Sequence, residues 1–476
     1  MKTMKNKAVA VMLIMLMVTA LLSGCKKEAG IGNDTSINPE TEVENGTPAE
    51  KTVMQKIRVW SDNAHEKELR LRQIEEFNST RGKELGIEIE YTVYGSNYQE
   101  AIKIAAQSGD APELFRPTTA FLVNFVNSGY MVPITDLPGG DELVAKYKDS
   151  LVNNQHIFNG EVYTLPYNLT TYKLIVNNDL FEKANITEYP RTWEELRSAA
   201  KKITEVGNGK AFGWVLGLKS DWLISTYLIR TNGKNVGHVG FNYETMQFEF
   251  SAFAPAIEAV QGMIEDGSVF PGFDRLDADA ARAQFAEGRV GMIPGASFDT
   301  SVYSDQFPAD CNWSAVPIPA FTEEGSPYKD FADATSLLGV GIAALDKEKK
   351  TLEVLKFFYS DENAAQMYEN SLYIPFRQTA IDIAKISPVQ KGFADFANIP
   401  DRVLILPLPD TRVSITGDAY RITIGNIFAG AYGDQEVKTV LADLDNRYNT
   451  ALALLSPEVL KEYEQTREVI ENFRKN

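Results

Sequence analysis

Residues Gly160 to Phe181, with the sequence GEVYTLPYNLTTYKLIVNNDLF, decide how we interpret the fold of this chain. Pro166 biases its neighbour Leu165 towards an extended conformation and offers no N–H to a strand ladder. The apolar run Leu174-Ile175-Val176 follows, and Asn177-Asn178-Asp179 then starts a predicted helix. We interpret the stretch as the crossing between two lobes and as part of the wall of a ligand cleft.

Upstream of this stretch, the residues from Lys56 onward predict a strand, a helix and a second strand. Ile57 and Val59 alternate with polar residues, residues 66–77 show helical spacing, and residues 87–93 alternate again. Strands joined by a helix in so short a segment pair in parallel. The pattern continues and predicts a large α/β protein with a helical C-terminal end. Further helices are predicted at 98–108, 192–206, 222–231, 255–266, 277–287, 434–454 and 457–474, and strands at 113–115, 211–215, 290–293, 315–319 and 337–343.

The composition favours a folded, acidic protein. Of 476 residues, 44% are hydrophobic and 11% aromatic, which is ample for a packed core. The formal net charge of −18 argues against nucleic acid as a partner. The two cysteines, Cys25 and Cys311, provide no disulfide framework, and we interpret Cys311 as a small buried hydrophobic residue.

Local motifs for metals, cofactors and covalent chemistry are absent from the sequence. His65, His156 and His238 lie far apart without ligand spacing, so we expect no metal site. There is no Walker-type phosphate loop, dinucleotide fingerprint or nucleophile elbow, and we expect no cofactor. A pair of carboxylates for glycoside hydrolysis stays open, because such pairs meet only in the fold.

The N-terminus carries a targeting pattern. Lys2, Lys5 and Lys7 precede an apolar segment that ends in Leu22-Ser23-Gly24-Cys25, which resembles a bacterial lipoprotein signal with diacylglycerol on the Cys25 sulfur. The alternative is an ordinary secretory signal or an uncleaved anchor. We therefore expect a signal peptide at 1–24, and a lipidated Cys25 with a flexible tether at 25–55. A single acyl chain binds a membrane only marginally, so a firm tether needs further acylation such as palmitate.

Aromatic residues stand beside short polar groups at the ends of several predicted strands. In open parallel sheets ligands bind beyond the carboxyl ends of the strands, so these segments are expected to converge on one cleft. An aromatic face packs on the apolar face of a pyranose ring, while Asp, Asn and Arg bind its hydroxyls. Each such aromatic taken alone is more often part of the core. The segments are Trp60-Ser61-Asp62, Arg116-Pro117-Thr118-Thr119, Tyr167-Asn168, Gly295-Ala296-Ser297 and Tyr373-Ile374-Pro375-Phe376-Arg377.

From about Lys56 to its end, the chain resembles the extracellular solute-binding proteins of ABC importers. This large family includes the maltose-binding and multiple-sugar-binding proteins. The resemblance rests on several motifs in a fixed order. They are Trp60-Ser61-Asp62, Ile74-Glu75-Glu76-Phe77-Asn78, Gln107 to Glu113, Gly129 to Ile134, Pro166-Tyr167 through Asn177 to Phe181, Pro190 to Leu196, Phe285 to Met292 and Arg447-Tyr448-Asn449.

The resemblance implies a periplasmic-binding-protein-like α/β fold, with two lobes joined by a hinge that the chain crosses three times. Lobe 1 would hold 56–163 and 313–372, and lobe 2 would hold 164–312 and 373–476. A ligand between the lobes would close them by hinge motion. The family's ligand-binding positions fall on Trp60, Asp62, Arg116, Tyr167, Asn168, Gly295, Ala296, Ser297, Tyr373 and Arg377, with Trp214 and Trp222 as weaker stacking candidates.

By the same resemblance, the protein would be a monomeric, non-enzymatic lipoprotein that captures a carbohydrate, in the first place an oligosaccharide, and delivers it to an ABC permease. It would be anchored through Cys25 on the outer face of a bacterial, Gram-positive cell membrane. Val176-Asn177-Asn178 departs from the family's Tyr-Asn-Lys, and Phe298 follows Gly295 one place later than usual, which leaves the sugar open. A surface glycan hydrolase and an extracellular sugar sensor that feeds a membrane kinase remain alternatives.

Overall fold

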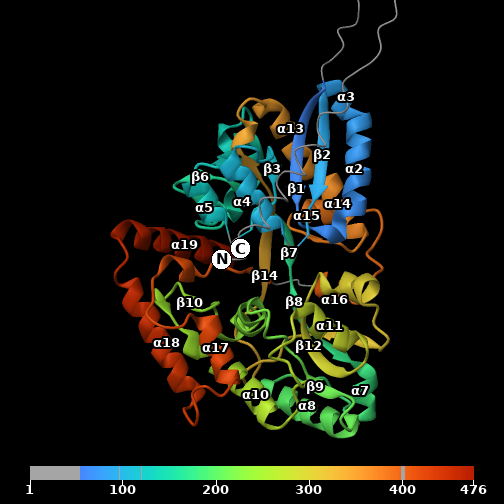
Figure 1. Ribbon diagram of the computed structural model, residues 1–476, viewed down its shortest axis with the longest axis vertical. Coiled ribbons are helices and arrows are strands. Elements are labelled where there is room, and N and C mark those ends of the chain that lie inside the picture. The colour runs from blue at the N-terminus through green and yellow to red at the C-terminus, as the bar shows by residue number, and fades with distance from the viewer. Residues whose placement is uncertain (1–53, 96, 119–120, 398–401, 476) are drawn as a thin grey trace, which may run out of the picture. The chain divides into compact units, whose positions relative to one another are not determined.

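The computed structural model of the protein describes residues 54–95, 97–118, 121–397 and 402–475 (Figure 1). The predicted signal peptide, the predicted lipidation site Cys25 and the tether up to residue 53 lie outside these ranges, as does Thr119. No helix within the described ranges combines the length and the apolar character needed to cross a membrane.

The larger of the two main sheets contains the strands that the N-terminal pattern predicted. Strand β1 pairs in parallel with both β2 and β3, because helical segments connect them. The later strand β14 is antiparallel to β3, β7 and β4. Ile57 and Val59 of β1 are fully buried, as their alternation predicted. The path is β15 (Ile374–Pro375), β7 (Thr164–Thr170), β14 (Asp330–Gly341), β3 (Leu114–Phe115), β1 (Gln55–Ser61) and β2 (Ile87–Val93), and β4 (Met131–Val132) and β16 (Arg402–Leu404) also pair with β14.

The smaller main sheet is built around the apolar run Leu174-Ile175-Val176. These residues lie in β8, which is antiparallel to strands on both of its sides, and all three are buried. The order is β13 (Trp313–Val316), β8 (Tyr172–Asn177), β12 (Val290–Ala296) and β9 (Phe212–Trp214). Two short hairpins complete the strands: β5 (Ile157–Phe158) with β6 (Glu161–Val162), and β10 (Phe241–Asn242) with β11 (Gln247–Phe248).

The helices follow the predicted pattern, with one exception. The segment predicted as a helix at 222–231 contains a π-helix, η4 (Ile224–Arg230), whose wider turns are rare and frequently lie at functional sites. The main α-helices are α2 (Lys67–Ser79), α4 (Tyr98–Ser108), α7 (Asn178–Lys183), α8 (Trp193–Gly207), α10 (Ala254–Glu265), α11 (Ala278–Ala286), α13 (Glu348–Phe358), α14 (Asp361–Glu369), α15 (Gln378–Asp382), α16 (Phe393–Ala397), α17 (Tyr420–Phe428), α18 (Val437–Leu452) and α19 (Pro457–Lys475).

The chain passes between the two main sheets later than the predicted lobe boundaries. After 163 it continues in the larger sheet as β7 and changes sheet only at Thr171. Strand β13, expected in lobe 1, pairs with β8 of the smaller sheet, and β15, expected in lobe 2, pairs with β7 of the larger one. Pro166 does not mark an exit, because it lies opposite Ser336 at an irregularity of the β7–β14 ladder, where a missing N–H is tolerated.

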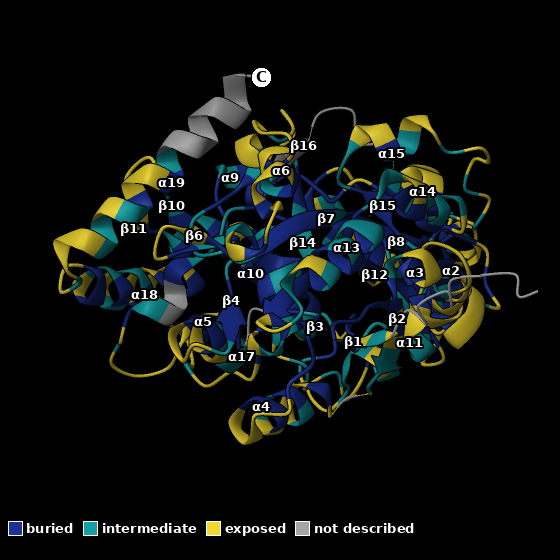
Figure 2. Ribbon diagram, turned by 90° about the horizontal axis from the view of Figure 1, so that it is seen from above, coloured by how far each residue is buried: buried dark blue, intermediate teal, exposed yellow. Residues whose placement is uncertain are grey.

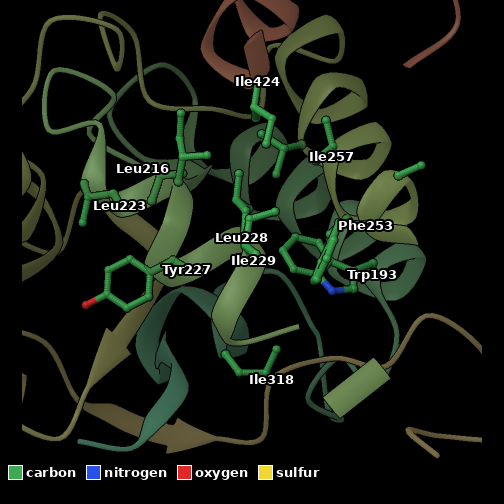
Figure 3. Packing of buried hydrophobic residues seen from close by; sticks show 14 of the residues in the cluster. Trp193, Leu216, Leu223, Tyr227, Leu228, Ile229, Phe253, Ile257, Ile318 and Ile424 are labelled. Carbon is green, nitrogen blue, oxygen red and sulfur yellow. The ribbon is translucent and has the colours of Figure 1, made fainter. Parts of the chain in front are cut away.

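Helices pack against both main sheets, and apolar side chains are buried between the helices and the sheets. In Figure 2 the strands are coloured mainly as buried, whereas helices such as α2 and α4 present exposed outer faces. The largest buried cluster lies around the smaller sheet and its helices. Figure 3 shows part of it, including Trp193 of α8, Ile257 of α10, Ile424 of α17 and the run Tyr227-Leu228-Ile229 of η4. Cys311 is buried, as predicted, and is a free cysteine.

Candidate functional site

The carboxyl ends of β1 and β3 bring Trp60, Asp62 and Arg116 together. The two strands are neighbours, and the backbone N–H of Arg116 donates to the Trp60 carbonyl at 2.9 Å. The Arg116 guanidinium forms an ion pair with Asp62 at 2.8 Å, and the two side chains stay 25% and 27% exposed. Burial alone would lower the pKa of Arg116, but the Asp62 carboxylate raises it. The pair is therefore charged and accessible at a strand end, where the sequence predicted ligand-binding groups.

An aromatic pair stands beside this ion pair. The ring centroids of Trp60 and Tyr94 are 4.7 Å apart with a tilt of 50°. Both side chains are only half-buried, so each leaves part of its surface open. Sequence reasoning missed Tyr94, although it directly follows β2 and satisfies the same rule of an aromatic residue at a strand end.

Tyr167 lies in the core, not on a surface. It is 5% exposed, and its hydroxyl accepts a hydrogen bond from Arg70 at 2.9 Å. Arg70 also forms an ion pair with Glu66 at 2.9 Å, and the side chains of both charged residues are at most 1% exposed. The ring of Tyr167 is covered by neighbouring aromatics, so it has no face available for stacking on a ligand. The covering rings belong to Tyr359 and Tyr373.

Tyr373 and Arg377, from the last predicted segment, have different surroundings. Tyr373 is buried, and its hydroxyl accepts a hydrogen bond from the Asn63 amide at 3.2 Å, next to Asp62. Arg377 forms an ion pair with Asp361 at 3.4 Å and lies over the ring of Tyr147. Tyr373 thus supports the residues at the end of β1. The described contacts of Arg377 are with Asp361 and Tyr147 instead.

Asn168 lies on the part of β7 that leads to the sheet change. Its side-chain oxygen accepts a hydrogen bond from Thr335 of β14 at 2.6 Å, and both side chains are half-buried. Because side chains alternate along a strand, Asn168 and Thr170 share one face of β7. Their β14 partners are Thr335 and Asp333.

Gly295, Ala296 and Ser297 are buried at the junction of β12 and β8. A Cβ on Gly295 would lie 2.2 Å from a methyl carbon of Ile175, so close packing explains this glycine. The Ser297 N–H donates to the Thr171 carbonyl at 2.9 Å, and the Ser297 hydroxyl accepts from the Thr171 N–H at 3.4 Å. These hydrogen bonds therefore hold the segment 295–297 against Thr171, the residue at which the chain changes sheet.

The two weaker tryptophan candidates differ in exposure. Trp214 is 1% exposed and packs edge-on against Trp193 in the core, which argues against a role as a stacking platform. Trp222 is half-buried and lies 6.1 Å from the ring of Tyr227.

The sequence did not indicate a further polar cluster, formed by Asp333, Arg230 and Tyr172. Asp333 of β14 forms an ion pair with Arg230 at 2.8 Å and also accepts a hydrogen bond from the hydroxyl of Tyr172. Its three members come from segments about 60 to 160 residues apart in the sequence. The predicted strand at 337–343 began too late to include Asp333. In the described part of the chain, no group of three or more His, Cys, Asp or Glu side chains is placed to hold a metal ion.

The comparisons with known proteins agree with this architecture. The profile of the bacterial extracellular solute-binding protein family matches residues 71–365. The GacH receptor of Streptomyces glaucescens GLA.O is 19% identical, with a TM-score of 0.66 over 85% of this chain and 100% of that chain. The maltotriose-bound maltose/maltodextrin-binding domain MalE of Bdellovibrio bacteriovorus is 16% identical, with a TM-score of 0.59 over 84% and 100%.

Among relatives compared by sequence, the sn-glycerol-3-phosphate-binding periplasmic protein UgpB of Pectobacterium atrosepticum is 23% identical over 350 residues. These cover 67% of this chain and 74% of that protein. The fold is thus that of the periplasmic-binding-protein-like class, as predicted. The chain belongs to the bacterial extracellular solute-binding protein family, which is named for binding and not for catalysis.

Proposed function

We propose that the protein captures a neutral carbohydrate, in the first place an oligosaccharide, and delivers it to an ABC permease. The observation that carries this proposal is the half-buried Trp60–Tyr94 pair beside the Asp62–Arg116 ion pair. An aromatic ring can cover the apolar face of a pyranose, and the adjoining carboxylate and guanidinium can accept from and donate to its hydroxyls. A single strand-end cluster thus supplies both kinds of contact that a sugar needs.

The charge at the site favours a neutral solute over an anionic one. The relative UgpB is named for sn-glycerol 3-phosphate, and a phosphate group is best held by cations that have charge to spare. Here Arg116 is paired with Asp62, so the cluster has no net charge. The solved structures of similar fold include a complex with acarbose and one with maltotriose, which supports a carbohydrate. A phosphorylated polyol is the second candidate, favoured by the name of the sequence relative alone.

We also propose how the protein closes over its ligand and where it is anchored on the cell. Lobes built on the two sheets would close over the ligand by motion at the connections between them, without covalent chemistry, and the closed monomer would be recognised by the permease. Acylation of Cys25 would hold the protein on the outer face of a Gram-positive cell membrane. The lipoprotein-like pattern before Cys25 supports this location, and the extracellular family is compatible with it.

Isothermal titration calorimetry tests the ligand class. The purified protein is titrated with maltotriose, raffinose, a wider panel of linear and branched oligosaccharides, and sn-glycerol 3-phosphate. We expect saturable binding of at least one oligosaccharide and none of the phosphate ester. Binding of the phosphate ester alone would replace the carbohydrate with the second candidate, and turnover of a saccharide during the titration would favour the hydrolase alternative.

A further inference from the structure

We propose that Arg230, Asp333 and Asn168 form a second sugar subsite, which binds the end of the ligand distant from Trp60. This inference rests on the proposed carbohydrate function and adds to it a second point of recognition. Asp333 and Asn168 lie on the β14 and β7 strands, and Arg230 ends the π-helix η4. Three segments distant in sequence therefore meet where the chain changes sheet.

The Arg230–Asp333 ion pair is accessible to solvent, unlike the Glu66–Arg70 ion pair in the core. The side chain of Arg230 is 37% exposed and that of Asp333 is 14% exposed, whereas Glu66 and Arg70 are at most 1% exposed. Complete burial takes both charges of an ion pair out of water at a desolvation cost, whereas the Arg230–Asp333 pair keeps contact with solvent. Partial exposure leaves guanidinium and carboxylate edges free to meet hydroxyl groups.

The hydrogen-bonding capacity of the group is only partly used. One carboxylate oxygen of Asp333 accepts hydrogen bonds from both Arg230 and Tyr172. The other carboxylate oxygen of Asp333 accepts no hydrogen bond from the described residues. The Asn168 side-chain oxygen accepts from Thr335, and its NH₂ group donates to none of the described residues. Free acceptor and donor positions on neighbouring strands suit a sugar, whose hydroxyls both donate and accept.

A row of aromatic side chains leads from this group towards the start of η4. The ring of Tyr172 meets the ring of Tyr227 edge-on at 6.2 Å, and Tyr227 lies 6.1 Å from the half-buried Trp222. Figure 3 shows Tyr227 projecting from the segment that also carries Leu228 and Ile229. Trp222 is thus linked to the Arg230–Asp333 pair through two buried rings, those of Tyr227 and Tyr172, and does not contact the pair directly among the described residues. Two Asp–Arg pairs whose charges balance match two parts of one uncharged ligand.

The spacing of the two groups indicates the length of that ligand. Phe115 pairs with Gly339 and Leu114 with Val340, so Arg116 continues to the level of Leu338 on β14. From Leu338 to Asp333 is five residues, or at most about 16 Å at 3.3 Å per residue, because the β7–β14 ladder is irregular at Ser336. Even with side chains that reach inward, this distance exceeds one pyranose ring. The geometry therefore points to an oligosaccharide that contacts both groups.

The test compares Asp333→Asn and Arg230→Lys with Asp330→Asn, in the purified full chain. Asp330 is the matched control, because it lies on the same strand and also pairs with cationic side chains, those of Lys173 and Lys234. Affinities for the oligosaccharides that the unchanged protein binds, and for their constituent monosaccharides, are measured by calorimetry. Thermal melting confirms that each variant folds, and Arg230→Lys keeps the test open if Asp333→Asn fails to fold.

We expect Asp333→Asn and Arg230→Lys to weaken oligosaccharide binding about tenfold to a hundredfold, the range of hydrogen bonds to charged groups. Asp330→Asn should stay within about twofold, and the loss should be smaller for monosaccharides held at the Trp60 end. The subsite is refuted if both test variants bind as the unchanged protein does, if Asp330→Asn loses as much, or if mono- and oligosaccharides lose equally. An unchanged protein that binds no saccharide overturns the carbohydrate function itself.

Discussion

The guanidinium of Arg70, on α2, donates a hydrogen bond at 2.9 Å to the hydroxyl of Tyr167, which lies 97 residues later on β7. Arg70 can only donate, so the Tyr167 oxygen is the acceptor. The same guanidinium donates to Glu66 at 2.9 Å within the buried core. Buried charges are costly unless they are paired and hydrogen-bonded, and Tyr167 supplies part of that compensation.

Tyr167→Phe is therefore expected to reduce stability and leave ligand affinity nearly unchanged. The substitution keeps the ring and removes the only group that accepts from the Arg70 Nη2 atom among the described residues. A hydrogen bond to a charged group contributes about 1.5–3 kcal/mol, which is the expected loss in the free energy of unfolding. Denaturant unfolding followed by calorimetry on the folded protein measures both quantities.

Tyr163→Phe serves as the control for this prediction. Tyr163 is half-buried and packs edge-on against Phe158, and its hydroxyl makes no hydrogen bond with the described residues. Its loss should change the free energy of unfolding by less than about 0.5 kcal/mol. If Tyr167→Phe keeps the parent's stability and loses affinity, then Tyr167 contacts the ligand and its assignment to the core is wrong.

A second prediction separates two tryptophans that look alike in the sequence. Trp60→Ala should weaken saccharide binding, since an aromatic contact adds about 0.5–1.5 kcal/mol beyond its buried area, with little loss of stability. Trp214→Ala should instead cost about 3–5 kcal/mol of stability, because that side chain is fully buried. Chemical denaturation and calorimetry distinguish the two outcomes. The reverse pattern, with Trp214→Ala stable and deficient in binding, would place the platform at Trp214.

The contrast between these tryptophans shows what periodicity can and cannot predict. Strand and helix positions follow from local spacing, and so the sequence predicts β1 and β12 in the right places, although too short for β12, and α4 with both of its bounds. Whether an aromatic residue at a strand end faces the core or solvent depends on what packs against it. For Tyr167 the deciding partner was Arg70, whose buried position no local pattern indicates.

Sheet membership was equally hidden from the sequence. The pattern of apolar and polar residues in β13 would suit an edge strand of either main sheet. Only the pairing of β13 with β8 shows that it belongs to the smaller sheet. Asp333 lay outside the predicted strand at 337–343, because its neighbours Ala332 and Ala334 give little hydrophobic signal. The candidate site could thus be predicted at the end of β1, whereas at the sheet change the sequence indicated Asn168 but neither Arg230 nor Asp333.

A third prediction concerns the Asp62–Arg116 ion pair. Asp62→Asn keeps the shape of the side chain but removes the charge that balances Arg116. Affinity for a neutral saccharide should fall about tenfold or more, since a charged acceptor becomes a neutral one. The freed cation should also give weak, salt-sensitive binding of sn-glycerol 3-phosphate. Titrations at low and high ionic strength measure both effects, and an undiminished saccharide affinity would exclude Asp62 from the site.

The fourth prediction is a pH dependence of stability from Asp445. Burial raises the pKa of this carboxyl from 3.8 to about 6, and the charge of Glu249 adds to the rise. The backbone N–H groups of Ser251 and Phe250, which donate to Asp445, oppose it. Below pH 3.8 the group is protonated in both the folded and the unfolded state. Above pH 6 it is ionised in both, and the folded state bears the cost of burying the charge.

Asp445→Asn should remove this cost. Relative to the parent, the variant should gain about 2–3 kcal/mol in the free energy of unfolding as the pH rises from 4 to 6, since one pKa unit corresponds to about 1.36 kcal/mol. Urea denaturation of both proteins at intervals across this range measures the difference. A difference that stays constant with pH would show that the carboxyl titrates normally in the folded protein.

A crystal structure with an oligosaccharide from the calorimetric panel tests the central claim most directly. We expect a pyranose ring over Trp60, with hydroxyls on Asp62 and Arg116, and the far end of the ligand at Arg230 and Asp333. A ligand bound away from Trp60, or a site that accepts only a phosphate ester, would contradict it.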